Sequence, residues 1–173
     1  MIAPIQTTYR GVVFRSRLEA RWAVFYDAIG VEWHYEHEGY ELPSGRYLPD
    51  FWIPSLDAFI EIKPADLAAS RVGYFVACFE LAEHTAKAVY CFHSEVQATT
   101  DSGVGAASFF GPRPDESSPA YCWCQCVACG TLSIEYSGRG NGARCGCSRN
   151  SLDTRATLPL LAASPSSASP GSH

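Results

Sequence analysis

The first part of the chain carries one helical and three strand-like patterns of hydrophobic residues. Residues 16–29 place apolar side chains at helical spacing, and Gly30 follows where such a helix would end. Residues 31–37 alternate apolar and polar side chains, which is the period of a half-buried strand. Two more strands are expected at 47–53 and 58–63, separated by a turn. The pattern therefore predicts a helix followed by a three-strand meander.

The residues up to position 93 add a second helix and a fourth strand. Residues 66–84 are broadly helical, although Gly73 weakens the middle of this segment. Residues 87–92 form a short apolar run of strand length. The order helix, three strands, helix, strand predicts an α/β core at residues 1–93, with a mixed sheet flanked by helices.

Beyond this core the pattern changes. Residues 94–120 are rich in Gly, Ala, Ser, Thr and Pro without periodicity, and we expect a linker there. Residues 121–149 hold six of the eight cysteines and predict a small second module. Residues 150–173 have no polar-apolar period, and we expect a disordered tail.

Composition and charge leave nucleic-acid binding open. The 173-residue chain is 47% hydrophobic, enough to bury one core with a small appendage. Its formal net charge is −5, but arginines gather near both ends while many acids lie within residues 32–61. Phosphate affinity depends on local basic clusters, so the overall charge does not exclude DNA. Solvated surface arginines are the alternative. The candidate DNA-binding residues are Arg15, Arg17, Arg139, Arg144 and Arg149.

The sequence carries no sign of secretion or membrane insertion. The N-terminal residues contain no apolar run of signal-peptide length, and no segment is long and apolar enough to span a bilayer. We therefore expect a soluble, cytoplasmic protein with no membrane partner. In a reducing cytosol, eight cysteines are better explained as metal ligands and core residues than as disulfides.

Two carboxylates and a lysine lie on neighbouring predicted strands. Glu61 comes eleven residues after Asp50 and two positions before Lys63. Strand alternation points Glu61 and Lys63 to one face and the neighbouring isoleucines to the other. Carboxylate oxygens are hard ligands that suit Mg²⁺, and it usually takes one or two of them from a protein. This pattern indicates a metal-dependent nuclease. The alternative is a solvated pair of charges at a strand edge.

The order of elements and the positions of the charged residues resemble a known nuclease superfamily. The helix carries an acid in Phe14-Arg15-Ser16-Arg17-Leu18-Glu19, the second strand carries Pro49-Asp50, and the third carries Glu61-x-Lys63. This arrangement resembles the PD-(D/E)XK nucleases over roughly residues 9–93. It looks most like phage Holliday-junction resolvases of the endonuclease I type and like transposon-end nucleases. The resemblance implies a restriction-endonuclease-like core that hydrolyses DNA phosphodiester bonds with Mg²⁺ or Mn²⁺.

The resemblance also implies roles for individual residues. The implied catalytic residues are Glu19, Asp50, Glu61 and Lys63. The implied ligands of Mg²⁺ or Mn²⁺ are the carboxylates of Glu19, Asp50 and Glu61 and the backbone carbonyl of Ile62. Lys63 would orient the attacking water or neutralise charge on the phosphate. Ser16-x-x-Glu19 is also a capping box, so the alternative for Glu19 is that it only satisfies the backbone N–H of Ser16.

The cysteine module predicts a structural zinc site. A Cys-x-x-Cys pair followed after a hairpin-like stretch by Cys-x-Cys has the spacing of two thiolate pairs around one tetrahedral Zn²⁺. The candidate ligands are Cys126, Cys129, Cys145 and Cys147. Four thiolates close the coordination sphere, so this zinc would fold a ribbon and perform no catalysis. Cys122 and Cys124 offer a competing register.

Together these features predict a DNA endonuclease that depends on Mg²⁺ or Mn²⁺, with a C-terminal zinc ribbon that binds DNA or a protein partner. Phage or mobile-element DNA processing is the setting that the resemblance suggests. The alternatives are a non-catalytic adaptor that binds nucleic acid or protein on a nuclease-like fold, and a structural zinc protein. The sequence leaves the substrate shape and the oligomeric state open, although a homodimer would suit an enzyme that cuts both strands.

Overall fold

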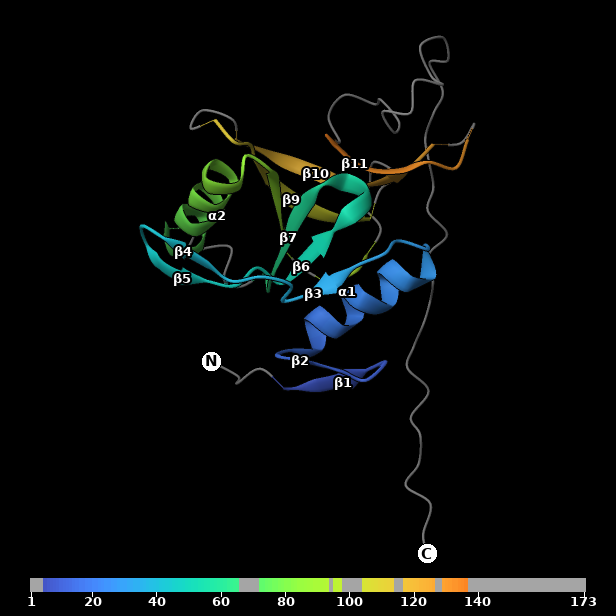
Figure 1. Ribbon diagram of the computed structural model, residues 1–173. Helices are drawn as coiled ribbons and strands as arrows, with labels where there is room; N and C mark the ends of the chain where they lie inside the picture. The colour runs from blue at the N-terminus through green and yellow to red at the C-terminus, as the bar shows by residue number, and fades with distance from the viewer. Residues whose placement is uncertain are drawn as a thin grey trace, which may run out of the picture.

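The computed structural model describes residues 5–65, 72–93, 95–97, 104–113, 117–126 and 129–136. These residues form a mixed α/β fold in which two helices flank a large mixed sheet (Figure 1). The described residues contain no helix that is long and apolar enough to cross a membrane. The expected tail at 150–173 lies outside the described residues.

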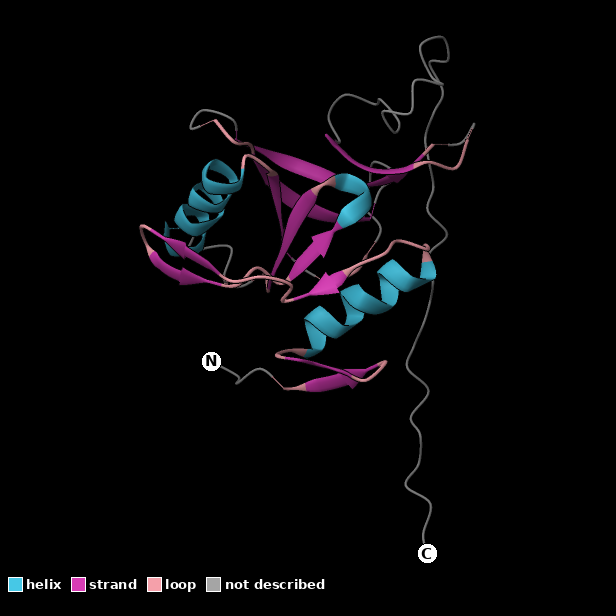
Figure 2. Ribbon diagram, in the orientation of Figure 1, coloured by secondary structure: helices cyan, strands magenta, loops and turns pink. Residues whose placement is uncertain are grey.

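The central sheet has seven strands in the order β11-β10-β9-β8-β7-β6-β3. Among the neighbouring strands of this described sheet, only β7 and β8 run parallel, and α2 lies between them in the chain. Figure 2 shows the strands in magenta and the helices in cyan. The strands are β3 (His34–Tyr35), β6 (Phe51–Ile53), β7 (Ala58–Lys63), β8 (Ala88–His93), β9 (Val104–Phe110), β10 (Ser117–Gln125) and β11 (Leu132–Tyr136).

Two small hairpins and three helical segments complete the described fold. The hairpins are β1 (Thr7–Tyr9) with β2 (Val12–Phe14) and β4 (Tyr40–Leu42) with β5 (Gly45–Tyr47). The helical segments are α1 (Arg17–Ala28), the short 3-10 helix η1 (Pro54–Leu56) and α2 (Val72–Thr85). The predicted helix at 66–84 overlaps α2, but residues 66–71 lie outside the described part of the chain.

Helix α1 begins where the sequence predicts, because Ser16 caps it. The Ser16 side chain accepts a hydrogen bond from the backbone N–H of Glu19. One face of the helix is apolar and buries Trp22 and Tyr26 completely. These rings pack against Phe51 and Phe92 from the sheet, so α1 covers one face of the sheet.

Helix α2 covers the opposite face. Its Leu81 and Ala82 are fully buried and join the cluster that contains Phe59 and Val89 of the sheet. Strand β7 separates the two clusters, because its side chains alternate between them. Ile60 and Ile62 belong to the α1 cluster, so Glu61 and Lys63 project toward the α2 side.

The meander differs in detail from the prediction. Strand β7 has the predicted bounds, but the strand expected at 31–37 is reduced to the two residues of β3. The strand expected at 47–53 is broken at residues 48–50, which separate β5 from β6. Pro49 lies in this break and has no backbone N–H to pair with a neighbouring strand. The backbone carbonyl of Asp50 accepts a hydrogen bond from the N–H of Glu36. The break places Asp50 at the entry to β6.

Residues 94–120, where the sequence predicts a linker, include β9 and the first part of β10. The small residues of β9 fit close under α1. Gly105 has a φ of +72°, and a Cβ atom there would lie 2.4 Å from the Trp22 ring and 2.8 Å from the Phe92 ring. Trp123 of β10 is completely buried in the α1 cluster. The described part of the cysteine module, β10 and β11, therefore continues the central sheet rather than standing apart from it.

Candidate functional site

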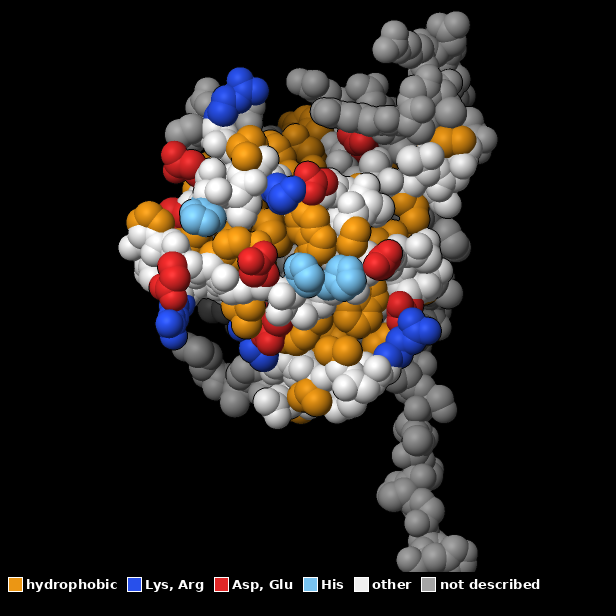
Figure 3. Space-filling model, viewed as in Figure 1, with side chains coloured by type: hydrophobic (Ala, Val, Ile, Leu, Met, Phe, Trp, Pro, Cys, Tyr) orange, Lys and Arg blue, Asp and Glu red, His pale blue; other side chains and the backbone are white. Residues whose placement is uncertain are grey.

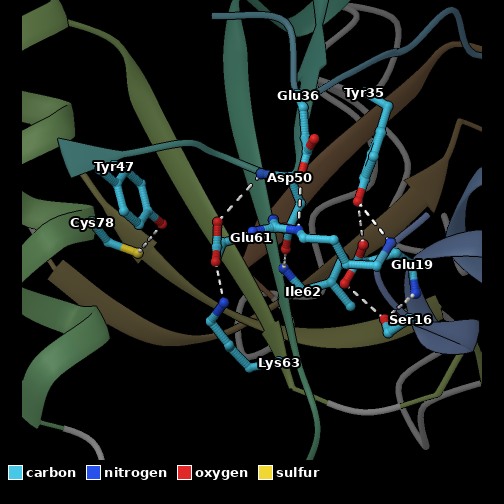
Figure 4. A network of polar contacts seen from close by, with 11 residues as sticks. Ser16, Glu19, Tyr35, Glu36, Tyr47, Asp50, Glu61, Ile62, Lys63 and Cys78 are labelled. Carbon is cyan, nitrogen blue, oxygen red and sulfur yellow. Dashed lines mark hydrogen bonds and ion pairs between the residues drawn. The ribbon is translucent and has the colours of Figure 1, made fainter. Parts of the chain in front are cut away.

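Asp50 and Glu61 face each other across two antiparallel strands. The register pairs Phe51 with Ile60, so the next pair outward is Asp50 with Glu61. Residues that are directly opposite in an antiparallel pair share a face of the sheet. The backbone N–H of Ile62 donates to Asp50 Oδ2 at 2.7 Å, and the N–H of Asp50 lies 3.4 Å from Glu61 Oε2 (Figure 4). These contacts hold both carboxylates in place.

Both carboxylates are buried. Asp50 is 1% exposed and Glu61 is 2% exposed. Burial raises the pKa of Asp50 well above its ordinary value, and the nearby Glu61 charge raises it further. Lys63 and the Ile62 N–H act in the other direction but do not outweigh these effects. Burial and the Glu61 charge thus disfavour the charged form of Asp50, whereas a neighbouring cation favours it.

Lys63 supplies one positive charge to the pair. Its Nζ contacts Glu61 Oε1, and its side chain is 24% exposed. Burial lowers the pKa of Lys63, but the charges of Glu61 and Asp50 outweigh burial and raise the pKa overall. The lysine is thus protonated and oriented toward the carboxylates.

Glu19 lies near this pair but is held by other partners. Its Oε1 accepts a hydrogen bond from the Ser16 hydroxyl at 2.7 Å, and its Oε2 accepts one from the Tyr35 hydroxyl at 2.6 Å. Glu19 is 7% exposed, and its charge contributes to the raised pKa of Asp50. The capping-box alternative concerns the backbone N–H of Ser16, whereas these contacts of the Glu19 carboxylate are with two side-chain hydroxyls. Its carboxylate binds the Ser16 hydroxyl and also reaches toward β3.

Arg15 connects these groups, although sequence reasoning assigned it only to DNA. Its Nη2 donates to Asp50 Oδ1 at 2.5 Å, and its Nε forms an ion pair with Glu36 Oε1 at 2.7 Å. Its backbone N–H donates to the Tyr35 hydroxyl at 3.0 Å. Arg17, the other N-terminal DNA candidate, is exposed in the first turn of α1.

Three further residues, Tyr35, Glu36 and Tyr47, complete the surroundings of the two carboxylates, and sequence reasoning had not placed the two tyrosines there. Tyr35 and Glu36 hold Glu19 and Arg15 as described above. Tyr47 lies beside Glu61 and its hydroxyl is 3.8 Å from Cys78 Sγ (Figure 4). Burial, followed by the charge of Glu61, raises the pKa of Tyr47, so its hydroxyl remains neutral. The break at residues 48–50 is the feature associated with Tyr47, because it separates the strand that ends at Tyr47 from the strand that follows Asp50.

The fit to a metal ion is partial within the described residues. No group of three or more Asp, Glu, His or Cys side chains is close enough there to hold a metal ion. The structure thus brings together Asp50, Glu61 and Lys63, with Glu19 close by. The proposed ligand role of the Ile62 carbonyl stays a prediction, while the Ile62 N–H orients Asp50.

The first half of the expected zinc site lies in the turn between β10 and β11. The N–H of Gly130 donates to the Cys126 carbonyl at 2.8 Å, and the N–H of Cys126 donates to the Thr131 carbonyl at 2.8 Å. These bonds close a tight turn that contains Cys129, and Gly130 has a φ of +74° within it. Cys145, Cys147, Arg139, Arg144 and Arg149 lie outside the described residues.

Cys122 and Cys124 form a second thiol pair on β10, with sulfur atoms 3.7 Å apart. The neighbouring Cys122 thiol and burial raise the pKa of Cys124, so this thiol stays protonated in the absence of a cation. Whether Cys122 or Cys124 replaces one of the proposed zinc ligands stays a prediction.

The site differs from the surrounding surface in that its oppositely charged side chains are in direct contact and partly buried. On the face drawn in Figure 3, described acidic and basic side chains lie among apolar ones. At the site, two buried carboxylates lie together with one ammonium and one guanidinium.

Comparisons of the chain with protein-family models, with curated proteins and with solved structures found no match.

Proposed function

We propose that this protein is a DNA endonuclease that depends on Mg²⁺ or Mn²⁺ and hydrolyses phosphodiester bonds, on a core of the PD-(D/E)XK type. One observation carries the proposal: Asp50, at the entry to β6, is buried beside Glu61 of β7, and Lys63 contacts Glu61. Burial of a charged group is costly unless it is paired, and a hydrophobic pair would stabilise a sheet better. Such placement is typical of functional sites.

The donor atoms support a hard divalent cation. Asp50 and Glu61 offer carboxylate oxygens, and each carboxylate can accept more bonds than the contacts described. These two residues would hold the ion, with Glu19 and the Ile62 carbonyl as the proposed additional ligands. When bound, such an ion would lower the pKa of the attacking water and stabilise negative charge on the phosphate.

The chain's own residues would do the remaining work. Lys63 is protonated and partly exposed, so its ammonium can neutralise charge that develops on the phosphate. Ser16 and Tyr35 orient the Glu19 carboxylate. Arg15 and Arg17 lie on the solvent side and can contact DNA phosphates.

A specific observation favours the second candidate, a non-catalytic adaptor for nucleic acid or protein. Asp50 is already neutralised in part by Arg15, and the described residues contain no group of three metal-ligating side chains. An adaptor would keep the charged site for binding without hydrolysis. The two candidates differ in one measurable property, which is cleavage in the presence of a divalent cation.

A structural Zn²⁺ in the β10–β11 hairpin belongs to the same proposal. Cys126 and Cys129 lie between β10 and β11, where the Gly130 N–H donates to the Cys126 carbonyl, and a Cys-x-x-Cys pair is the usual spacing of two zinc ligands. Cys145 and Cys147 would complete the tetrahedral site. The ribbon would then present its arginines to DNA, or its surface to a protein partner.

A cleavage assay tests the main proposal. Purified protein is incubated with branched, linear and single-stranded DNA in Mg²⁺, Mn²⁺ or EDTA, and the variants Asp50→Asn and Glu61→Gln are compared with wild type. Glu41→Gln is the matched control, because Glu41 is an exposed acid paired with Arg46. The proposal requires cation-dependent cleavage by wild type and Glu41→Gln, and its loss in the two site variants. DNA binding without cleavage would support the adaptor.

A further inference from the structure

We propose that Arg15 is a positioning residue that occupies Asp50 in the absence of DNA and releases it when a DNA phosphate takes the guanidinium. Cation binding and DNA binding would then be coupled through one side chain. This inference rests on the proposed function and deepens it, because it names how the same site is regulated.

The geometry of Arg15 carries the proposal. Its Nη2 reaches Asp50 Oδ1 at 2.5 Å, although Asp50 is only 1% exposed. The Arg15 side chain itself is 51% exposed, so the guanidinium lies at the boundary between the buried carboxylate and solvent. A phosphate can approach from that solvent side without entering the core.

The second contact of Arg15 explains how it is held in place. Its Nε binds Glu36 Oε1 at 2.7 Å, and the backbone N–H of Glu36 binds the carbonyl of Asp50 at 3.0 Å. Glu36 has a φ of +47°, a left-handed conformation that turns the chain after β3. Arg15 thus bridges two carboxylates that belong to one local unit, and the compact ammonium of a lysine lacks the planar fork that reaches both from here.

The backbone of Arg15, unlike its guanidinium, contacts the tyrosine that holds Glu19. Its N–H donates to the Tyr35 hydroxyl at 3.0 Å, and that hydroxyl donates to Glu19 Oε2 at 2.6 Å. The backbone contact remains when the guanidinium leaves. Glu19 therefore keeps its orientation while Asp50 becomes available to a cation.

Competition between Arg15 and a cation for Asp50 predicts the direction in which DNA changes cation affinity. A guanidinium and a divalent cation both neutralise Asp50, and they compete for the same oxygen. Without DNA, Arg15 weakens cation binding. With DNA, a phosphate offers Arg15 a bidentate partner and removes the competitor. Cation affinity should therefore rise when DNA binds, and DNA affinity should rise equally when the cation binds.

The experiment measures Mn²⁺ binding to the full chain by calorimetry, first without DNA. Arg15→Gln should bind Mn²⁺ about tenfold more tightly than wild type, which corresponds to roughly 1.4 kcal/mol. Arg46→Gln is the charge-matched control, because Arg46 is 89% exposed and pairs with Glu41 away from Asp50. This control should bind Mn²⁺ as wild type does. Arg15→Lys keeps the charge if Arg15→Gln fails to fold, and it should show a smaller gain.

The second part adds a short duplex DNA that has been made resistant to cleavage. Wild type should bind Mn²⁺ more tightly with this DNA than without it, and Arg15→Gln should lose most of that difference. Equal Mn²⁺ affinity of wild type, Arg15→Lys and Arg15→Gln without DNA would overturn the role of Arg15 while leaving a cleaving wild type as an endonuclease. Absence of both Mn²⁺ binding and cleavage in all proteins would overturn the proposed function together with this inference.

Discussion

Asp50 is a buried carboxyl group that the fold itself does not require. It is buried beside Glu61, and burial together with that neighbour raises its pKa. An amide of the same shape could still accept the hydrogen bond from the Ile62 N–H, which is 2.7 Å from Asp50 Oδ2. The Asp50 carboxylate is therefore better explained by what it binds than by a contribution to the stability of the fold.

Asp50→Asn should stabilise the metal-free protein at pH 8. Because the folded pKa of Asp50 is raised above its ordinary 3.8, its protonated form favours folding, and this contribution is lost as pH rises through the folded pKa. A gain of about 1 kcal/mol corresponds to roughly 2–4 °C in Tm for a chain of this size. Thermal melts at pH 5 and pH 8 in EDTA check it, with Asp57→Asn as the exposed control. A lower Tm for Asp50→Asn at pH 8 would contradict the argument.

Lys63→Met should lower the cleavage rate and preserve cation binding. The ammonium acts on water and phosphate rather than on the ion, and loss of a group that moves or orients protons lowers rates by roughly 10²–10⁴-fold. Lys87→Met is the matched control, because Lys87 pairs with Asp57 at 2.5 Å and lies outside the site. Single-turnover cleavage and Mn²⁺ calorimetry separate the two effects. Loss of Mn²⁺ binding in Lys63→Met would refute this role.

At the scale of elements, the sequence predicts segments whose own pattern is strong. Residues 58–63 alternate clearly and become β7, and Ser16 marks the start of α1. The prediction is less successful for β9, whose Gly, Ala and Ser residues resemble a linker. Those small residues fill space under Trp22, a contact made by residues far apart in the sequence. Packing of this kind has no local signal.

Contacts between residues far apart in the sequence have no local signal, and this also explains which part of the site could be predicted. Asp50, Glu61 and Lys63 lie on one predicted sheet face, so alternation and a short strand connection bring them together. Arg15, by contrast, meets a carboxylate 35 residues away, and Glu19 meets a tyrosine 16 residues away. The spacing along the chain contains no period that predicts either contact.

Gly105→Ala should destabilise the protein much more than Gly11→Ala. Both glycines have positive φ, +72° and +80°, so each substitution carries a backbone penalty of roughly 1–2 kcal/mol. A Cβ at Gly105 would also lie 2.4 Å from the Trp22 ring, whereas one at Gly11 would meet nothing within 4 Å. Overpacking should add roughly 1–3 kcal/mol at Gly105. Urea denaturation measures both values, and equal losses would contradict the close packing of β9.

At the scale of the whole molecule, one sheet joins the carboxylate site to the cysteine hairpin. The strand order β11-β10-β9-β8-β7 runs without interruption from Cys126 to Glu61. Trp123 of β10 is buried with Phe25 and Tyr26 of α1, with ring centroids 6.3 Å and 5.7 Å apart. The expected independence of the cysteine module therefore does not hold for its described strands, and metal binding there should affect the whole protein.

Cys129→Ser should release the proposed Zn²⁺ and lower the Tm of the entire protein in a single transition. Zinc binding contributes folding free energy to the hairpin, and β10 transmits its loss to the α1 core through Trp123. Elemental analysis and calorimetry of protein prepared under reducing, chelator-free conditions measure zinc content and unfolding together. Cys124→Ser is the control, because Cys124 lies on β10, just before the turn that contains Cys129, but outside the proposed ligand set, so it should retain zinc. Zinc loss in Cys124→Ser with retention in Cys129→Ser would assign the site to the other register. A separate low-temperature transition in Cys129→Ser, with the main Tm unchanged, would show that the hairpin folds independently of the sheet to which it is hydrogen-bonded.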